Sequence, residues 1–138
     1  MLALTFLSAC GGDTSGVGDD PAPPEPRGTA APLVVLVRYG GIAGSNDRVS
    51  VDALGVATVI SDRSPAPSTR TLSSTELAGL RNALERAEIA SLQRNYLDRS
   101  AADAYQFDVT YQGVTVTADE GVLPARLRPV VDQLVRLM

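Results

Sequence analysis

The stretch that decides the fold is LVVLVRYGGIAG, which occupies residues 33–44. It opens with five consecutive apolar residues, three of them β-branched, and such a run is typical of a strand that is covered on both faces. We therefore expect residues 33–37 to form a central strand of a sheet. Three glycines within the next five positions after Tyr39 follow it, and glycine reaches positive φ without a Cβ clash. The strand is predicted to end there in a tight turn.

This glycine-rich segment has two interpretations, and the pattern leaves both open. Ile42 and Ala43 lie between the glycines, which favours an ordered loop that tucks Ile42 against the domain while exposing its backbone. In the first interpretation the loop is a structured turn between strands and nothing more. In the second it forms a contact surface for a partner.

Alternating polar and apolar residues predict further strands on the C-terminal side of the turn. The clearest hairpin signal is Gln112-Gly113, which stands between two alternating runs as the two-residue turn of a hairpin does. The predicted strands are residues 33–37, 48–53, 56–60, 105–111 and 114–118, with residues 70–72 as a candidate short edge strand.

Two amphipathic segments predict helices. Ser73 and Glu76 have the spacing of a capping box, which predicts a helix over residues 74–88. A second helix is expected to start within residues 126–129, since proline is tolerated in the first turn of a helix but not deeper. Between the helices, Leu92 and Tyr96 are predicted to pin a weakly patterned loop to the core.

These elements predict an α+β domain: an antiparallel sheet of four or five strands with both helices packed on one face. The domain covers residues 33–138, and a length of about 105 residues suffices for a core of its own. We expect this domain to be monomeric.

Composition excludes several classes of function. The chain has no histidine and one cysteine, so it cannot contain a histidine-based triad, a histidine-ligated metal site or a disulfide framework of its own. Its net charge is −4, and acids and bases are interleaved without a basic stripe, which argues against a nucleic-acid partner. We expect neither a cofactor nor an enzymatic activity. Asp119 and Glu120 are adjacent acids near an element end, but neighbours on a strand point to opposite faces and make a poor catalytic pair.

The single cysteine follows a short apolar segment. Leu7-Ser8-Ala9-Cys10 resembles the lipobox of bacterial lipoproteins, which implies a signal peptide at residues 1–9 and a lipid on Cys10. The apolar run is short and has no Lys or Arg before it, so we expect the signal peptide to be incomplete here. The alternative is a free cysteine in a disordered tail. Residues 10–32 are rich in Gly, Asp and Pro and are predicted to be a tether.

A family resemblance rests on four short motifs and their order along residues 33–138. The motifs are Arg38-x-Gly40-Gly41-Ile42-Ala43-Gly44, then Val51-Asp52-x-x-Gly55, then Leu72-Ser73 with Glu76-Leu77 and Leu80, then Thr117-Ala118-Asp119-Glu120 before Leu123-Pro124. Together they resemble the emfourin family, small proteins named for an inhibitor of protealysin, a thermolysin-like metallopeptidase. The resemblance implies the fold more strongly than it implies inhibition.

Two functions follow as expectations, both in the cell envelope outside the cytoplasm. The first is a lipid-anchored inhibitor of a thermolysin-like zinc metallopeptidase. The second is a protein-binding or structural lipoprotein without inhibitory activity. The candidate partner-binding residues are Gly40, Gly41, Ile42, Ala43, Gly44, Ser45 and Asn46, with Asp119 and Glu120 as a charged contact.

Overall fold

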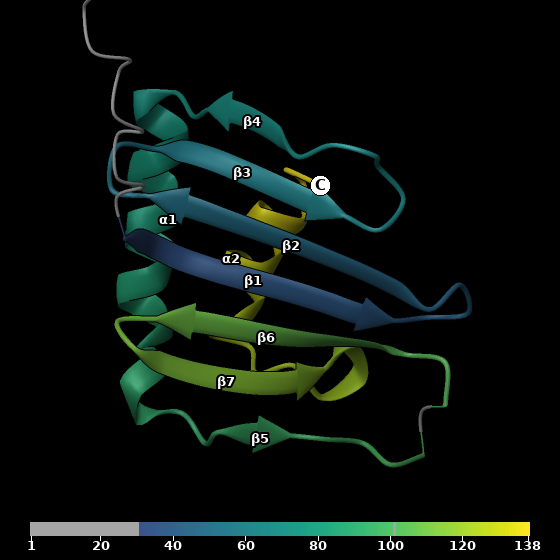
Figure 1. Ribbon diagram of the computed structural model, residues 1–138. Helices are drawn as coiled ribbons and strands as arrows, with labels where there is room; N and C mark the ends of the chain where they lie inside the picture. Colours follow the sequence, from purple (N-terminus) through teal and green to yellow (C-terminus); the bar gives the residue numbers. More distant parts are fainter. Residues whose placement is uncertain (1–30, 101) are drawn as a thin grey trace, which may run out of the picture.

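The computed structural model describes residues 31–100 and 102–138 (Figure 1). Cys10, the predicted signal peptide at residues 1–9 and nearly all of the predicted tether at residues 10–32 lie outside this part of the chain.

The described residues form one sheet and two α-helices. The strands are β1 (Pro32–Gly40), β2 (Ser45–Asp52), β3 (Val56–Ser61), β4 (Ser68–Thr71), β5 (Asn95–Tyr96), β6 (Tyr105–Tyr111) and β7 (Val114–Asp119), in the order β4-β3-β2-β1-β6-β7-β5. The helices are α1 (Ser74–Ala87) and α2 (Arg128–Val135), with short 3₁₀ turns η1 (Ile89–Ser91) and η2 (Glu120–Val122).

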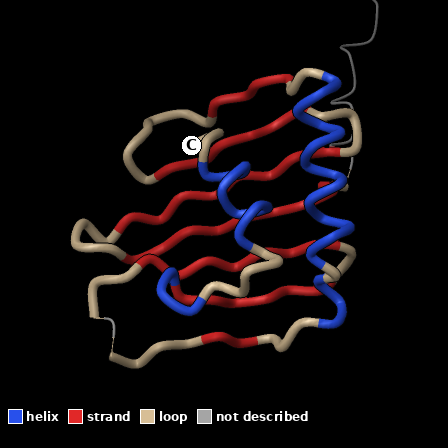
Figure 2. Tube along the Cα trace, turned by 180° about the vertical axis from the view of Figure 1, so that it is seen from behind, coloured by secondary structure: helices blue, strands red, loops and turns tan. Residues whose placement is uncertain are grey.

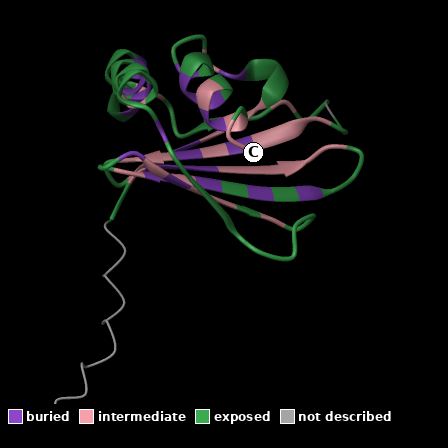
Figure 3. Cartoon of the chain, turned by 90° about the horizontal axis from the view of Figure 1, so that it is seen from above, coloured by how far each residue is buried: buried purple, intermediate pink, exposed green. Residues whose placement is uncertain are grey.

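The predicted fold class is confirmed: the domain is α+β, and both helices lie on one face of the sheet (Figures 2 and 3). The five long strands are those predicted from the apolar run and the alternating patterns, and β1 is central. The expectation that β1 is covered on both faces is wrong as regards the helices, because both described helices lie on one face only (Figure 3). The sheet has seven strands because a short strand adds to each edge, β4 next to β3 and β5 next to β7. β5 pairs parallel to β7, so the sheet is mixed and departs there from the antiparallel pairing that was predicted.

The core lies between the helices and alternate residues of the long strands. Leu36 in β1 pairs with Val49 of β2 on one side and with Val109 of β6 on the other, and none of the three exposes any surface. Leu80 and Leu84 of α1 close this layer from above. Within residues 31–100 and 102–138, no helix lies on the opposite face of the sheet (Figure 3).

The local signals of the sequence correspond to observed geometry. Gln112 and Gly113 both have positive φ, 50° and 76°, as a type I′ hairpin turn requires. Ser73 and Glu76 form the full capping box at the start of α1. Leu92 and Tyr96 are partly buried against the core, as predicted.

The loops β1–β2, β3–β4 and β5–β6 leave the sheet at the same end, away from α1 (Figures 1 and 2). This end carries the predicted partner-binding segment. Of the described helices, none has the length and apolar character to cross a membrane.

Candidate functional site

The glycine-rich segment is the turn of the β1–β2 hairpin. Residues 41–44, here called the hairpin tip, connect the two strands beyond the pair formed by Gly40 and Ser45. The Gly44 N–H donates to the Gly41 carbonyl at 3.0 Å. Gly41 and Gly44 have φ of 69° and 61°, which confirms the prediction of positive φ in this segment. The turn therefore has a defined backbone that glycine makes accessible.

The prediction that Ile42 tucks against the domain is wrong. Ile42 is 93% exposed, and Ala43 beside it is also exposed. The reason is the turn itself: the chain reverses beyond the last strand pair, and none of the described helices or strands covers residue 42. An aliphatic side chain is thus displayed at the end of the molecule.

The base of the hairpin is anchored on both sides. Gly41 donates its N–H to the Ala104 carbonyl at 3.4 Å, which ties the tip to the β5–β6 loop. Asn46 donates its N–H to the Asp62 carboxylate at 3.0 Å and accepts from the Asp62 N–H at 3.2 Å. Ser45, one of the predicted partner-binding residues, is 2% exposed. Its side chain is therefore part of the interior and is not available to a partner.

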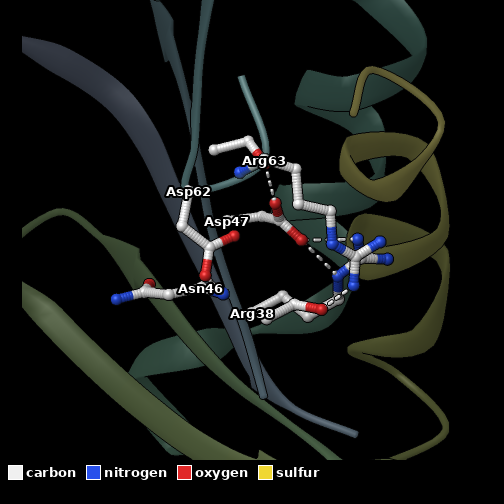
Figure 4. Close-up of polar contacts among 7 residues, drawn as sticks. Arg38, Asn46, Asp47, Asp62 and Arg63 are labelled. Carbon is white, nitrogen blue, oxygen red and sulfur yellow. Dashed lines mark hydrogen bonds and ion pairs between the residues drawn. The ribbon is translucent and has the colours of Figure 1, made fainter. Parts of the chain in front are cut away.

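A polar cluster lies beneath this base, on the helix-bearing face of the sheet (Figure 4). Arg38 and Asp47 pair across β1 and β2, and Arg38 donates to Asp47 Oδ2 from Nε at 3.2 Å and from Nη2 at 2.6 Å. Ser61 donates to the other carboxylate oxygen. Arg63 donates to the Ser45 hydroxyl. Arg38 also lies over the Tyr105 ring, 4.9 Å from its centroid, a cation–π distance.

The pKa of the Asp47 carboxyl reflects opposed influences. Burial is the largest single influence and raises the pKa. Hydrogen bonds from Ser61 and Arg38 and the charges of Arg38 and Arg63 lower the pKa, and together they outweigh the effect of burial. The net result is a pKa below the ordinary value of 3.8. Asp47 is therefore ionised in the folded protein near neutral pH.

The second nominated site, Asp119 and Glu120, lies at the same end of the sheet. Tyr39, Gln106 and Asp119 form one cross-strand row over β1, β6 and β7, so roughly 10 Å separates Asp119 from the hairpin strand. Asp119 accepts from the Gln106 side chain at 2.8 Å and from the Asp98 N–H at 2.6 Å. Its carboxylate fastens the β5–β6 loop. Glu120 is exposed at the start of η2, so it is the better candidate for a charged contact.

Sequence reasoning gave no role to Asp47, Ser61, Arg63 or Tyr105. A signal existed for one pair: a four-residue turn at residues 41–44 places Arg38 opposite Asp47, because antiparallel partners count outward equally from the turn. No comparable signal existed for Arg63, which comes from an irregular loop.

Within residues 31–100 and 102–138, no three acidic, cysteine or histidine side chains converge to hold a metal ion.

Replacement of Gly40 by alanine is expected to destabilise the domain much more than replacement of Gly44. Both have positive φ, at 97° and 61°, but a Cβ on Gly40 would lie 2.8 Å from the Ala104 carbonyl oxygen, whereas one on Gly44 meets no atom within 4 Å. We expect a loss of about 1 kcal/mol for Gly44→Ala and roughly 2 kcal/mol or more for Gly40→Ala in urea unfolding. Equal losses of unfolding free energy in the two variants would refute the close approach of Gly40 to Ala104 in the β5–β6 loop.

Asp47→Asn is expected to remove part of the acid sensitivity of the fold. Because the pKa of Asp47 is lower in the folded protein than in the unfolded chain, its ionised carboxylate stabilises the fold at any pH above the ordinary pKa of aspartate. This stabilisation is lost as the pH falls through the pKa of the folded protein. At pH 7 the variant should lose about 2 kcal/mol or more, because Arg38 is left without its carboxylate. Unfolding free energies measured at pH 7 and near pH 3 should therefore differ less in Asp47→Asn than in the parent.

The control is Asp103→Asn, which removes the same charge at an exposed position of the β5–β6 loop. If Asp47→Asn retains the full acid sensitivity of the parent, the ion pair has no stabilising role.

Comparison with known proteins adds no relationship to this picture. No protein-family model matches the chain, and no curated protein matches it. The emfourin resemblance therefore stays a prediction that rests on the residues quoted above.

Proposed function

We propose that this chain is an envelope lipoprotein whose domain binds and inhibits a thermolysin-like zinc metallopeptidase, with the hairpin tip as the contacting wedge. The observation that carries the proposal is Ile42, which is 93% exposed on a turn of defined backbone. The target class comes from the emfourin resemblance of residues 33–138.

A wedge of this kind binds well because the backbone of the hairpin tip is already ordered before the partner arrives. The tip is held by the Gly41–Gly44 hydrogen bond, by the bond from Gly41 to Ala104, and by Asn46 pairing with Asp62. Pre-organisation reduces the conformational entropy lost on association. A peptidase cleft binds extended chain segments and has pockets for side chains, so an aliphatic residue on a rigid loop is a suitable occupant.

In the part of the chain that the structure describes, which contains neither cysteine nor histidine, the groups available to face a catalytic zinc are oxygens. The chain has no histidine, so backbone carbonyls of the tip and the exposed Glu120 carboxylate are the metal-directed candidates at this end of the sheet. Asp119 is less suitable because its carboxylate oxygens already accept two hydrogen bonds.

A second candidate function is a protein-binding or structural lipoprotein that inhibits no enzyme. It is favoured by the sheet face without a helix (Figure 3). Ile60 of β3 lies on that face, because it pairs with Arg48 and not with the buried Val49, and it is 49% exposed. A partner that binds this face would leave the hairpin tip free.

The inhibition proposal predicts that the protein reduces the activity of at least one thermolysin-like peptidase in a saturable manner. The assay measures residual activity of a panel, including peptidases encoded by the same genome, at increasing protein concentration. Ile42→Asp should weaken inhibition by roughly 30-fold or more, the scale of a central contact residue. The fold should survive, since the side chain touches almost nothing.

The matched control is Ile60→Asp, which makes the same change on the sheet face without a helix. It should leave inhibition within about twofold. Absence of inhibition at micromolar protein across the whole panel would reject the peptidase target. Inhibition that Ile42→Asp leaves intact would keep the target and reject the tip.

The anchor is tested separately through Cys10, which lies outside the described residues. Cys10→Ala, expressed with any upstream coding sequence, should move the protein from the membrane fraction to the soluble fraction, because the acyl chains supply the membrane affinity. Mass spectrometry of the native protein should find lipid on Cys10. An unmodified cysteine, or a variant that still sediments with membranes, would contradict the lipoprotein assignment.

A further inference from the structure

We infer that the hollow between Arg38 and Arg63 is a binding site for an oxyanion group, either a carboxylate or a phosphate. The hollow measures about 300 Å³ and opens on the helix-bearing side of the sheet, below the hairpin base. Both guanidinium groups point into it, one from β1 and one from the β3–β4 loop (Figure 4). This inference does not depend on the peptidase proposal.

The charges in the hollow do not balance. Among the side chains that line the hollow, two guanidinium groups face one carboxylate, that of Asp47, so these side chains carry an excess of one positive charge. Met138, the last residue of the sequence, also lines the hollow, and its main-chain carboxylate forms no ion pair with either arginine. Asp47 already accepts three hydrogen bonds, because one oxygen accepts twice from Arg38 and the other accepts from Ser61. Within the described part of the chain, no carboxylate lies at ion-pair distance from Arg63. The chain as a whole carries a net charge of −4, so this excess is local.

Arg38 is held in place before any ligand arrives. Its side chain is 18% exposed, and it is fixed by Asp47 on one side and by the Tyr105 ring on the other. An ionic interaction with the Arg38 guanidinium is stronger here than on the open surface, because less water surrounds the charge. A planar guanidinium with fixed N–H directions matches a group that presents two oxygens, as carboxylates and phosphates do.

Arg63 plays a different part, because it is exposed and comes from an irregular loop. Its one hydrogen bond in the hollow goes to the Ser45 hydroxyl. A neutral hydroxyl does not neutralise the guanidinium charge, whose influence on a carboxylate in the hollow is the lowering of the Asp47 pKa. The remaining N–H groups can donate to an anion that enters the hollow, with the Ser68 hydroxyl on the adjacent wall.

The size of the hollow limits the ligand to a small group. A terminal carboxylate of a peptide and a free or esterified phosphate share the required chemistry. The two sources are separated by using inorganic phosphate and N-acetylglycine as probes, the second being a model of a peptide C-terminus.

The test follows the Arg38 Nε–H and the Asp47 and Ser61 amide signals of the full chain by nitrogen-edited NMR at constant ionic strength. At least one probe should shift these signals in a saturable manner, with a dissociation constant of about 1 mM or tighter. Saturation by phosphate alone assigns the site to phosphate groups, and saturation by N-acetylglycine assigns it to carboxylates.

Arg63→Gln should weaken the binding by about tenfold or more, the scale of one lost charge-assisted contact. Arg63 is exposed, so the variant keeps the fold, and unchanged Arg38 and Asp47 signals without ligand would verify this. The control is Arg48→Gln, which removes the same charge from the opposite face of the same hairpin and should change the affinity by less than about twofold. If neither probe saturates, if Arg63→Gln binds as the parent does, or if Arg48→Gln weakens binding equally, the assignment is overturned.

Discussion

The structure depends on the register of β1 between its two neighbours. Leu36 must stand between Val49 and Val109 for all three to face the helices. A slip of one residue would turn this row to the other face of the sheet, because successive side chains alternate. Among the described residues, helices cover one face of the sheet and not the other (Figure 3), so the register is strongly specified. Replacement of a wholly buried leucine at this position by alanine would cost about 2 to 5 kcal/mol.

The same register produces the polar end of the domain. Two positions beyond Leu36 on the same face stands Arg38, and its partner in β2 is Asp47. A buried ion pair contributes less to stability than its short distances indicate, because both charges lose water. The main effect of the Arg38–Asp47 pair is to fix the position of the hairpin. Asp47 also accepts a hydrogen bond from Ser61, so the pair joins the hairpin to the end of β3. The hairpin tip beyond it is therefore presented on a fixed base.

The regular part of the fold could be predicted because its determinants are local. The apolar run at residues 33–37, the turn at Gln112-Gly113 and the capping box of Ser73 each specify geometry through near neighbours in the chain. β5 could not be predicted in this way. It has two residues, Asn95–Tyr96, and it is held by distant groups, the Thr117 N–H donating to the Arg94 carbonyl and the Asp119 carboxylate accepting from Asp98.

The candidate site shows the same division. Positive φ in the glycine segment follows from composition, whereas the direction of Ile42 depends on what lies beneath the turn, and no local pattern gives that. The placing of Arg63 beside Arg38 depends on the path of the β3–β4 loop. Asp119 was a candidate for a partner contact from sequence, and the structure gives its carboxylate two internal partners instead.

The chain offers a direct measurement of the central claim, that the hairpin tip is the contact surface for a peptidase. It contains isoleucine at positions 42, 60 and 89, which lie on the tip, on the sheet face without a helix and in the core, with exposed fractions of 93%, 49% and 2%. Methyl NMR of isoleucine-labelled protein during titration with an inhibited peptidase therefore reports on three separate places. We predict that the Ile42 signal shifts or broadens at stoichiometric peptidase while those of Ile60 and Ile89 follow only the slower tumbling of the complex. A selective change at Ile60 with Ile42 unaffected would contradict the claim and move the contact surface to the sheet.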